Sequence, residues 1–304
     1  LTHDNGYFQQ KRKEQNKFWL LQTIESTLKS DFYNDPNVKL ELKKQLKNAI
    51  IAALLTPDDP AAVDIYSANS VKIKGKPFLL GRILDQEGKA IEYLWRANNY
   101  AQYLLGHQLR IDKQGQENRY WVSIKLVNDH KMVAAKGIKS WVAHASDRFN
   151  LPESLILGII ETESGFNPFA VSHANAYGLM QIIPATAGKD VFQKIYKKSG
   201  KPSREYLFNA NNNIMMGSAY LSILRDRYLK GIKHPTSQLY CIISAYNSGA
   251  GNVFKTFHTN RKQAIKRINS LSVEAVLWSL RTKNPSLEAR RYLEKVLASQ
   301  KKYP

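Results

Sequence analysis

The sequence predicts an α+β fold in two domains, an α+β domain over residues 1–135 and a mainly α domain over residues 136–304. Three observations predict this division. Segments rich in β-branched and aromatic residues alternate with helical spacing up to about residue 127, whereas the spacing beyond residue 136 is helical almost throughout. A chain of 304 residues is also long enough to bury two hydrophobic cores.

The first domain begins with two segments of helix-like spacing. The first covers residues 7–30, so residues 1–35 are expected to be either a helix packed on the body or a tether. In the second, residues 38–55, leucine and isoleucine recur along one face before the stop signal Thr56-Pro57-Asp58-Asp59-Pro60.

Strands are expected in the rest of this domain. Four segments are rich in β-branched and aromatic residues, namely Val71–Lys74, Phe78–Leu84, Ala90–Trp95 and Tyr120–Val127. A helix over residues 98–109 interrupts them, and residues 86–88 and 112–118 supply turns. Helices and strands in separate runs are typical of an α+β domain.

The second domain opens with an amphipathic helix, whose apolar face consists of Ile138, Trp141, Val142, Ala145 and Phe149. Apolar helical spacing continues through most of the remaining sequence. We therefore expect a mainly helical domain from residue 136 onward.

Glu163 lies at the end of an apolar helix that begins near residues 150–151, because Pro152 and Glu153 are typical of a first turn. At about 100° per residue, Glu163 falls within the apolar stripe, whereas Glu161 points to the opposite side. Burial disfavours the charged carboxylate and raises its pKa, which a general acid needs near neutral pH. The ordinary alternative is an acid in the last turn that stays in water, since acids are rarely buried.

The charge of the chain is strongly basic and unevenly distributed. The net charge is +20, and residues 136–304 hold 25 Lys and Arg against 10 Asp and Glu. Such a field attracts an extended polyanion, whether nucleic acid, anionic lipid or an acidic cell-wall polymer. No nucleic-acid motif accompanies the basic residues, so we expect no nucleic-acid partner.

The remaining composition excludes several classes. Cys241 is the one cysteine, in an apolar run, so a buried thiol is expected and an internal disulfide is impossible. No segment approaches the roughly 20 apolar residues of a membrane span. The seven histidines lack ligand spacing, so neither a metal nor a cofactor is expected. The chain opens without a visible signal segment and is expected to be a mature or trimmed form.

Three motifs follow one another in the second domain, first Glu163-Ser164-Gly165-Phe166-Asn167-Pro168 with Ser172, then Gly178-Leu179-Met180-Gln181, then Ala245-Tyr246-Asn247. In order and spacing they resemble the lysozyme-like lytic murein transglycosylases. Further segments of both domains extend the resemblance to residues 40–304. The resemblance implies a lysozyme-like fold for residues 136–304.

The resemblance implies cleavage of the bond between N-acetylmuramic acid and N-acetylglucosamine in peptidoglycan, without water as acceptor. Glu163 is expected to protonate the leaving oxygen and then to act as base while the muramoyl 6-hydroxyl attacks, giving a 1,6-anhydro end. Ordinary glycosidases use two carboxylates. Residues 164–189 contain no Asp or Glu, which suits a single acid, although a distant acid such as Asp226 could fold into the cleft.

The resemblance also implies the other site residues. It assigns substrate contacts to Ser172, Tyr177, Gly178, Met180, Gln181, Tyr246, Asn247 and Tyr292. Ser172 would orient the substrate, Gln181 would contact the N-acetyl region, and Tyr246 would hold the Glu163 carboxyl by a hydrogen bond. Ser172 could instead be a turn serine, and Met180 could be core.

Location and partners follow from the same resemblance. It implies an outer-membrane lipoprotein facing the periplasm that binds peptidoglycan glycan strands, although the lipobox cysteine is absent from this sequence. Two alternatives stay open, a goose-type muramidase that hydrolyses the bond and a noncatalytic basic peptidoglycan- or nucleic-acid-binding module.

Overall fold

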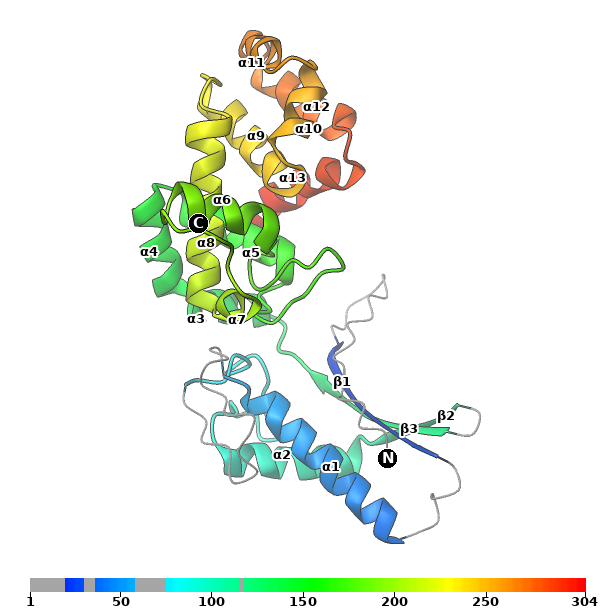
Figure 1. Ribbon diagram of the computed structural model, residues 1–304. Coiled ribbons are helices and arrows are strands. Elements are labelled where there is room, and N and C mark those ends of the chain that lie inside the picture. Colours follow the sequence, from blue (N-terminus) through cyan, green and yellow to red (C-terminus); the bar gives the residue numbers. More distant parts are fainter. Residues whose placement is uncertain (1–19, 30–35, 58–74, 115–116) are drawn as a thin grey trace. The chain divides into compact units, whose positions relative to one another are not determined.

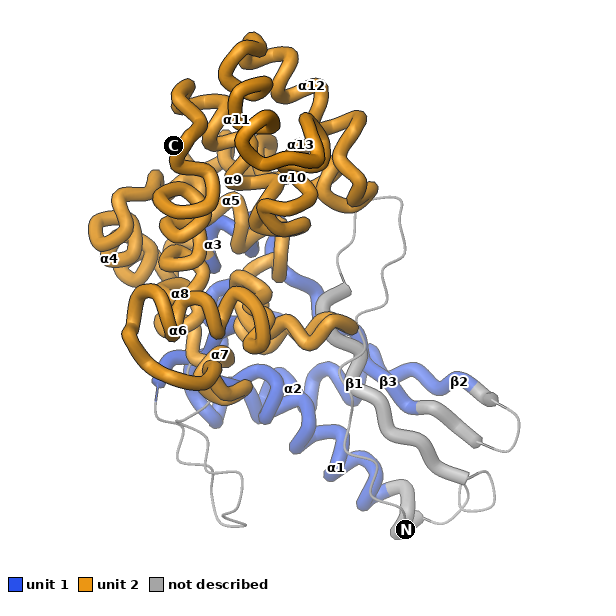
Figure 2. Tube along the Cα trace, turned by 45° about the horizontal axis from the view of Figure 1, so that its top comes forward, with its two compact units in different colours: residues 1–134 blue, residues 135–304 orange. Residues whose placement is uncertain are grey.

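The computed structural model describes residues 20–29, 36–57, 75–114 and 117–304 (Figure 1). The chain divides into two compact units, Leu1–Ala134 and Ala135–Pro304 (Figure 2). Unit 1 combines helices with a small sheet, and unit 2 is helical, so the predicted α+β class is confirmed. Within the described residues, no helix combines the length and apolar character needed to cross a lipid bilayer.

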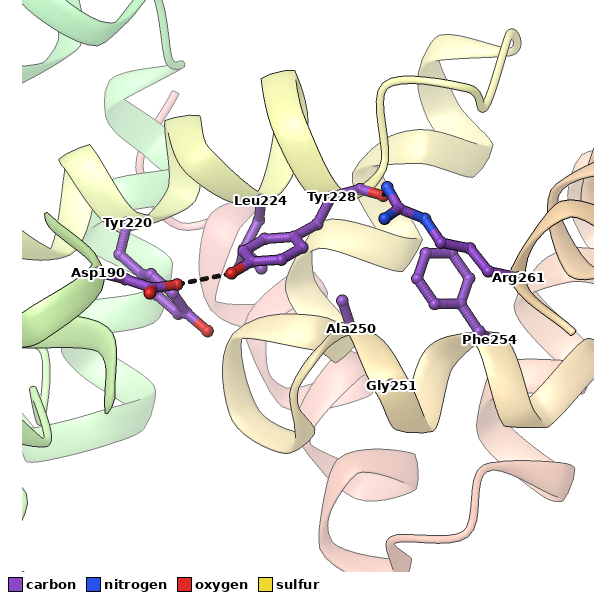
Figure 3. A pocket seen from close by; sticks show the side chains of 8 residues that line it. All are labelled: Asp190, Tyr220, Leu224, Tyr228, Ala250, Gly251, Phe254 and Arg261. Carbon is purple, nitrogen blue, oxygen red and sulfur yellow. Dashed lines mark hydrogen bonds between the residues drawn. The ribbon is translucent and has the colours of Figure 1, made fainter. Parts of the chain in front are cut away.

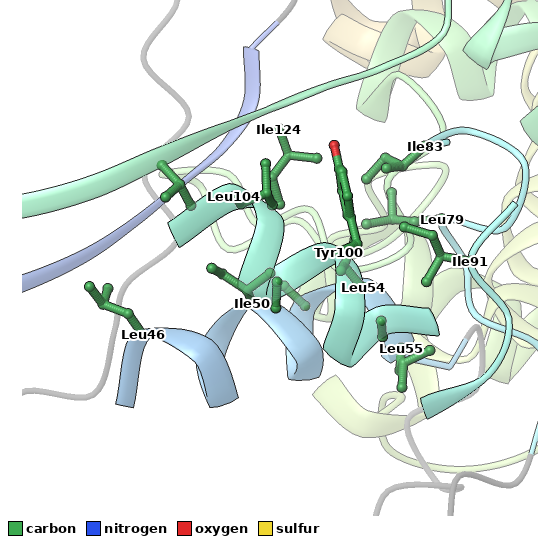
Figure 4. Packing of buried hydrophobic residues seen from close by; sticks show 14 of the residues in the cluster. Leu46, Ile50, Leu54, Leu55, Leu79, Ile83, Ile91, Tyr100, Leu104 and Ile124 are labelled. Carbon is green, nitrogen blue, oxygen red and sulfur yellow. The ribbon is translucent and has the colours of Figure 1, made fainter. Parts of the chain in front are cut away.

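The core of unit 1 is formed by two helices, by one strand of a small sheet and by the buried loop residues Leu79, Ile83 and Ile91 (Figure 4). Helix α1 (Pro36–Leu55) confirms the helix predicted over residues 38–55, and it buries Leu42, Leu46 and Ile50 at four-residue spacing. Helix α2 (Leu94–His107) buries Ala97, Tyr100, Ala101 and Leu104 against the same core. This helix begins four residues before its predicted start at residue 98.

The sheet has the order β1-β3-β2 and is antiparallel throughout. Its strands are β1 (Leu20–Lys29), β2 (Arg110–Gln114) and β3 (Glu117–Lys125). Strand β3 confirms the strand predicted over Tyr120–Val127. The helix predicted over residues 7–30 is wrong for Leu20–Lys29, because ladder hydrogen bonds to β3, with Ile24 opposite Val122, outweigh the helix-like spacing.

Two other strand predictions in this unit are wrong. Residues 78–84 form turns with isolated bridges, and the segment predicted over residues 90–95 leads directly into α2. Leu79, Ile83 and Ile91 are buried, so these loops carry the apolar composition of strands while Gly81, at φ +70°, bends the chain.

The turns of unit 1 agree with the predictions in part. The turn predicted over residues 86–88 is confirmed, with Gly88 at φ +72°. Most of the turn predicted over residues 112–118 belongs instead to β2 and β3. The predicted strand Val71–Lys74 and residues 1–19 lie outside the described residues.

Helix α3 (His130–Gly137) crosses the boundary between the units. Unit 2 then consists of α4 (Lys139–Phe149), α5 (Glu153–Ser164), α6 (Lys189–Lys194), α7 (Arg204–Phe208), α8 (Ala210–Ile223), α9 (Pro235–Ser248), α10 (Ala250–Phe257), α11 (Arg261–Ser270), α12 (Val273–Lys283) and α13 (Leu287–Gln300). Two π-helical turns, η3 (Pro184–Gly188) and η4 (Leu224–Tyr228), precede α6 and follow α8.

Helix α5 is packed between α4 and α13. It begins at Glu153, two or three residues after the predicted start at residues 150–151, because Pro152, at the N-cap position, has a non-helical ψ of 132°. It ends at Ser164, and Gly165, with a φ of +58°, is its left-handed C-terminal cap. In α4 the predicted face is confirmed for Val142, Ala145 and Phe149, which are buried.

Cys241 lies in α9 and is fully buried, as predicted. Burial raises the pKa of its thiol well above the usual range. The thiol is therefore a small apolar core group rather than a nucleophile.

Candidate active site

Glu163 stands in the last turn of α5, where it meets α13. The hydroxyl of Tyr292 donates a 2.7 Å hydrogen bond to Glu163 Oε1. Tyr292 is itself 5% exposed, so the phenol is held rigidly by the surrounding core. The Glu163 side chain is only partly buried, which leaves its carboxyl a route to a ligand.

Burial raises the pKa of Glu163 from 4.5 to about 7. The hydrogen bond from Tyr292 acts in the opposite direction and lowers this pKa, while the negative charge of Glu288 raises it. A carboxyl with a pKa near 7 is substantially protonated at neutral pH, which is the state that a general acid requires. The direction of the shift agrees with the one expected from the helix face.

The helix-face prediction is wrong for Glu161, which was expected to point away from the apolar stripe but is buried. It is 6% exposed, and it accepts hydrogen bonds from Lys302 Nζ at 2.7 Å and from Tyr303 Oη at 2.9 Å. The end of the chain covers this side of α5, which helical spacing alone cannot reveal. Glu161 and Glu163 are therefore both withdrawn from water, but of these two acids Glu161 alone pairs with an ammonium group among the described residues.

Ser172 lies in the loop that follows α5, and its Oγ accepts hydrogen bonds from the backbone N–H groups of Ala174 and Ala176, at 3.2 and 3.1 Å. This is the geometry of a turn serine, the alternative considered for it. Gln181 also holds the loop, since its Nε2 donates to the carbonyl oxygens of Ala170 at 3.1 Å and Gly178 at 2.9 Å.

Asn213 of α8 organises the same loop and was not expected from the sequence. It is fully buried, its Oδ1 accepts from the Met180 N–H at 2.7 Å, and its Nδ2 donates to the Tyr177 carbonyl at 2.8 Å. A Cβ on Gly178, where φ is +77°, would lie 2.3 Å from Asn213 Nδ2, so only glycine fits. Three consecutive asparagines follow Ala210 at the start of α8, so the sequence alone did not distinguish Asn213 from its neighbours.

Met180 does not offer its side chain to a ligand in this structure, contrary to the expected apolar contact. It is fully buried, because Gly217 of α8 leaves the space that its thioether fills. Tyr177 is partly exposed, and its ring packs edge-on against Phe208 at 5.7 Å between centroids. The guanidinium of Arg204 also lies over the Tyr177 ring at 5.7 Å.

Tyr246 takes a different partner from the one expected. Its hydroxyl donates to the Met180 carbonyl at 2.8 Å, and the bond to Glu163 comes from Tyr292 instead. The reason is that the Met180 carbonyl points at Tyr246, while α13 places its own tyrosine at the carboxyl. Asn247 donates from Nδ2 to Glu288 Oε1 at 3.1 Å, which ties α9 to the first turn of α13.

Other acids of unit 2 lie in ion pairs or on the surface. Asp190 pairs with Lys194 at 2.8 Å, and Asp226 is exposed and pairs with Arg225 at 2.7 Å. Glu205 is exposed in the first turn of α7. Glu288, which the sequence analysis did not single out, is the acid whose charge acts on Glu163. Within the described ranges, no group of three or more His, Cys, Asp or Glu is arranged to hold a metal ion.

Comparison with known proteins gives two adjacent family matches. Residues 33–136 match the N-terminal domain of membrane-bound lytic murein transglycosylase C, and residues 140–269 match the transglycosylase SLT domain. Tyr292, Glu288 and the residues that cover Glu161 lie beyond the second match.

Curated relatives carry the name of the first family match. Membrane-bound lytic murein transglycosylase C of Yersinia pestis (strain Pestoides F) is 47% identical over 259 residues, which are 85% of this chain and 72% of that protein. The Yersinia pseudotuberculosis protein (serotype O:1b, strain IP 31758) gives the same values.

Among solved structures, an inactive mutant of lytic transglycosylase Slt from Pseudomonas aeruginosa is 25% identical with a TM-score of 0.42, covering 53% of this chain and 23% of that one. The 70-kDa soluble lytic transglycosylase in complex with bulgecin A is 25% identical with a TM-score of 0.44, covering 58% and 25%. On its sequence identity and its two domain matches, the chain belongs to the membrane-bound lytic murein transglycosylase C family and is a lytic transglycosylase of peptidoglycan.

Proposed function

We propose that Glu163 is the single acid and base of a non-hydrolytic cleavage of the bond between N-acetylmuramic acid and N-acetylglucosamine. The protonated carboxyl gives its proton to the glycosidic oxygen as the bond to the muramoyl C1 breaks. The resulting carboxylate then takes the proton of the muramoyl 6-hydroxyl while that oxygen bonds to C1 of the same sugar. One bond is broken and one is formed, and the proton count of Glu163 is restored.

The observation that carries this proposal is a carboxyl poised near neutral pH. Its pKa is raised to about 7 by burial, and Tyr292 holds one oxygen at 2.7 Å, so the other oxygen is left to face the substrate. A nucleophile within the sugar needs no second carboxylate to activate water, in contrast to an ordinary glycosidase.

Hydrolysis, as in a goose-type muramidase, is the alternative that a specific observation favours. Glu288 is exposed and close enough for its charge to act on Glu163, so it could activate a water molecule. Its bond from Asn247 Nδ2 orients one carboxylate oxygen and leaves the other to the solvent.

The surrounding residues divide into those that touch substrate and those that hold the loop. We assign substrate contact to Tyr177, Ser172, Gln181 and Asn247. Because Gln181 Nε2 donates its hydrogen bonds to carbonyl oxygens of the loop, Gln181 contacts an N-acetyl N–H through Oε1. Gly178, Met180 and Tyr246 set the path of the backbone beside Glu163.

We infer that the protein acts in the periplasm as an outer-membrane lipoprotein. The relatives are named membrane-bound, and the basic excess of residues 136–304 suits a wall polymer that carries stem-peptide carboxylates. Fractionation of cells that produce the full-length protein tests this, since recovery in the outer-membrane fraction supports anchorage and recovery in the soluble fraction contradicts it.

Mass spectrometry of soluble products from purified peptidoglycan sacculi tests the reaction. Wild-type protein is expected to release anhydro-ended muropeptides. Glu163→Gln keeps the size of the side chain but cannot transfer a proton, so it is expected to release at least about a hundredfold less product. Reducing ends would establish hydrolysis, and near-normal activity of Glu163→Gln would overturn the assignment of the acid.

A further inference from the structure

We propose that a basic surface on unit 2 binds the phosphate headgroups of an anionic phospholipid bilayer. This surface, the basic patch, consists of the exposed residues Lys230, Lys233, Lys262, Lys266 and Arg267. It lies on α11 and on the segment between η4 and α9, at the end of unit 2 drawn at the top of Figure 1. The proposal rests on the proposed location at a membrane and adds a contact with lipid that the protein surface itself makes.

The part of the sequence that supplies the basic patch contains no acid. Residues 227–273 hold eight Lys and Arg and no Asp or Glu, whereas residues 136–304 as a whole hold 25 against 10. Asp226, the last acid before this segment, pairs with Arg225 at 2.7 Å. Within the part of the chain that the structure describes, no ion pair engages a side chain of the basic patch. Its positive charges are therefore available to an anionic partner.

Helix α11 (Arg261–Ser270) presents its basic residues on one face. Ala264 and Ile268 are buried, so this side of the helix packs into unit 2. Lys262 and Lys266 are four residues apart and therefore form a row on the exposed side, with Arg267 beside it. The three charges stand on one convex surface that faces the solvent.

The segment after η4 is fixed beside the same helix. Asn269 of α11 donates from Nδ2 to the carbonyl oxygen of Gly231 at 2.9 Å, and its Oδ1 accepts from the backbone N–H of Lys233 at 2.9 Å. A Cβ built on Gly231 would lie 3.0 Å from the Ile265 side chain, so the backbone of this segment lies close to α11. Lys230 and Lys233 flank Gly231. The two basic segments, distant in sequence, therefore form one surface.

The basic patch is separate from the pocket of unit 2 that Figure 3 shows. Arg261 belongs to that pocket, where its Nη2 donates to the carbonyl of Tyr228 at 2.7 Å and its guanidinium lies 5.2 Å from the centre of the Phe254 ring (Figure 3). Arg227 turns toward α6, where its Nη2 donates to the carbonyl of Lys194 at 3.4 Å. No residue of the basic patch lines the pocket. A partner on the patch therefore need not compete for the pocket.

A bilayer suits this surface better than a single acidic peptide does. A carboxylate is bound best by a fixed arginine fork, whereas lysines are separate point charges on flexible stems. Four of the five patch residues are lysines, and the arginine, Arg267, directs Nη1 to the carbonyl of Phe257 at 3.5 Å. Anionic lipids diffuse in the plane of a bilayer and can gather beneath separate charges. Clusters of about four to eight Lys and Arg are accordingly typical of surfaces that bind anionic lipids.

The binding is expected to be electrostatic. None of the large apolar side chains that are exposed in the described part of the chain falls within residues 227–273, and the next along the sequence is Trp278 of α12. The patch therefore lacks both a group to insert into hydrocarbon and an aromatic platform on which nucleic-acid bases could stack. Salt should release it, because the Debye length falls from about 10 Å at 0.1 M to about 3 Å at 1 M.

The experiment measures cosedimentation of the 304-residue chain with lipid vesicles. Vesicles of equal parts phosphatidylglycerol and phosphatidylcholine are compared with vesicles of phosphatidylcholine alone. The chain is expected to bind the anionic vesicles at low salt, to leave them at about 1 M salt, and not to bind the neutral ones. Lys262→Gln combined with Lys266→Gln is expected to weaken binding about 25-fold, since each charge near an anionic surface contributes about fivefold in affinity.

The matched control is Arg291→Gln combined with Lys295→Gln. It removes the same charge, at the same four-residue spacing, from the exposed side of α13, where the acids Glu288 and Glu294 are neighbours along the helix. Binding of the control to anionic vesicles is expected to fall about twofold or less, because the local field of α13 is close to neutral.

Each outcome decides the proposal. Absence of binding, equal binding to both kinds of vesicle, or an equal loss in the two double variants overturns it. Lys230→Gln combined with Lys233→Gln is expected to reproduce the loss from the other segment of the patch, and it replaces the α11 variant if that variant fails to fold. Binding to purified sacculi is measured in parallel. Weaker binding to sacculi with unchanged binding to vesicles would assign the patch to the wall polymer and overturn the lipid assignment.

The vesicle measurement needs neither turnover nor a covalent anchor. A failure of the basic patch would therefore appear in the vesicle series alone. A failure of the proposed reaction would appear in the muropeptide products, and a failure of the proposed location would appear in the fractionation of cells.

Discussion

Tyr292 donates its hydroxyl hydrogen to Glu163 across 129 residues of sequence, at 2.7 Å. The bond has two effects on the carboxyl, since it orients one oxygen and favours the ionised form. Burial favours the neutral form and is the larger effect, because the pKa of Glu163 is raised to about 7. The acid proposed for catalysis is thus subject to two opposed effects, burial and the hydrogen bond from Tyr292 of α13.

Replacing Tyr292 by phenylalanine is expected to lower turnover about tenfold, since a hydrogen bond to a charged group contributes about 1.5 kcal/mol. Losing this bond removes the contribution that lowers the pKa of Glu163, so the fall of activity at high pH should move to higher pH. The measurement is the pH dependence of kcat/KM. Tyr246→Phe is the control, because it loses the bond to Met180 and is expected to reduce activity less, without moving this limb.

Glu288→Gln is expected to move the fall of activity at high pH in the opposite direction, to lower pH. Its charge raises the pKa of Glu163, so its neutralisation should lower that pKa and move the fall of activity to lower pH. The control is Glu294→Gln, which changes an exposed acid of α13 that pairs with Arg281. Product analysis separates an electrostatic role of Glu288 from a role in activating water. If Glu288 acts only through its charge, the variant should still release anhydro ends. If the wild type hydrolyses the bond and the variant loses all reducing-end products, Glu288 is the activator of water.

The sequence predicts elements whose apolar spacing is local. The helix over residues 38–55 follows from the helical period of its own apolar residues, and the strand over Tyr120–Val127 follows from its own β-branched and aromatic composition. Residues 78–84 fail this reasoning because a buried loop has the composition of a strand. Residues 20–29 fail because pairing with β3, almost 100 residues later, decides their conformation.

The site divides in the same way. Glu163 was found from its own helix, its cap and the motif that follows. Tyr292 was expected in the cleft, but its bond to Glu163 depends on how α13 packs on α5, which no local pattern encodes. Burial of Glu161 likewise depends on Lys302 and Tyr303 at the end of the chain.

Gly178→Ala is expected to destabilise the loop that follows α5 more than Gly165→Ala. Both glycines have positive φ, +77° and +58°, so each alanine carries a backbone cost of about 1 kcal/mol. Only at residue 178 would the new Cβ overlap another group, lying 2.4 Å from the Leu207 carbonyl oxygen. Thermal unfolding of both variants measures the difference, and equal losses would show that overlap at residue 178 is relieved by movement of Asn213.

Glu161→Gln is expected to affect stability rather than chemistry. The change removes the charge that pairs with Lys302 while keeping an acceptor for Tyr303, so a loss of about 1 kcal/mol is expected. Tyr303→Phe, which removes one of the two bonds, should cost a similar amount. The measurement combines denaturant unfolding with kcat at a temperature where both variants are folded. A collapse of kcat in folded Glu161→Gln would mean that the wrong acid of α5 has been assigned to catalysis.

Glu163→Gln is expected to stabilise the protein at high pH while it abolishes turnover. The pKa of Glu163 is about 7 in the folded chain and 4.5 by reference, so between these values the folded state holds a proton that the unfolded state has lost. The free energy of unfolding of the wild type therefore falls as pH rises through this window, by about 3 kcal/mol in all. Glutamine has no such titration, so the variant should gain up to that amount at pH 8 and nothing near pH 4. Urea unfolding at both pH values measures it, and an equal difference at the two pH values would show that burial does not hold the proton on Glu163.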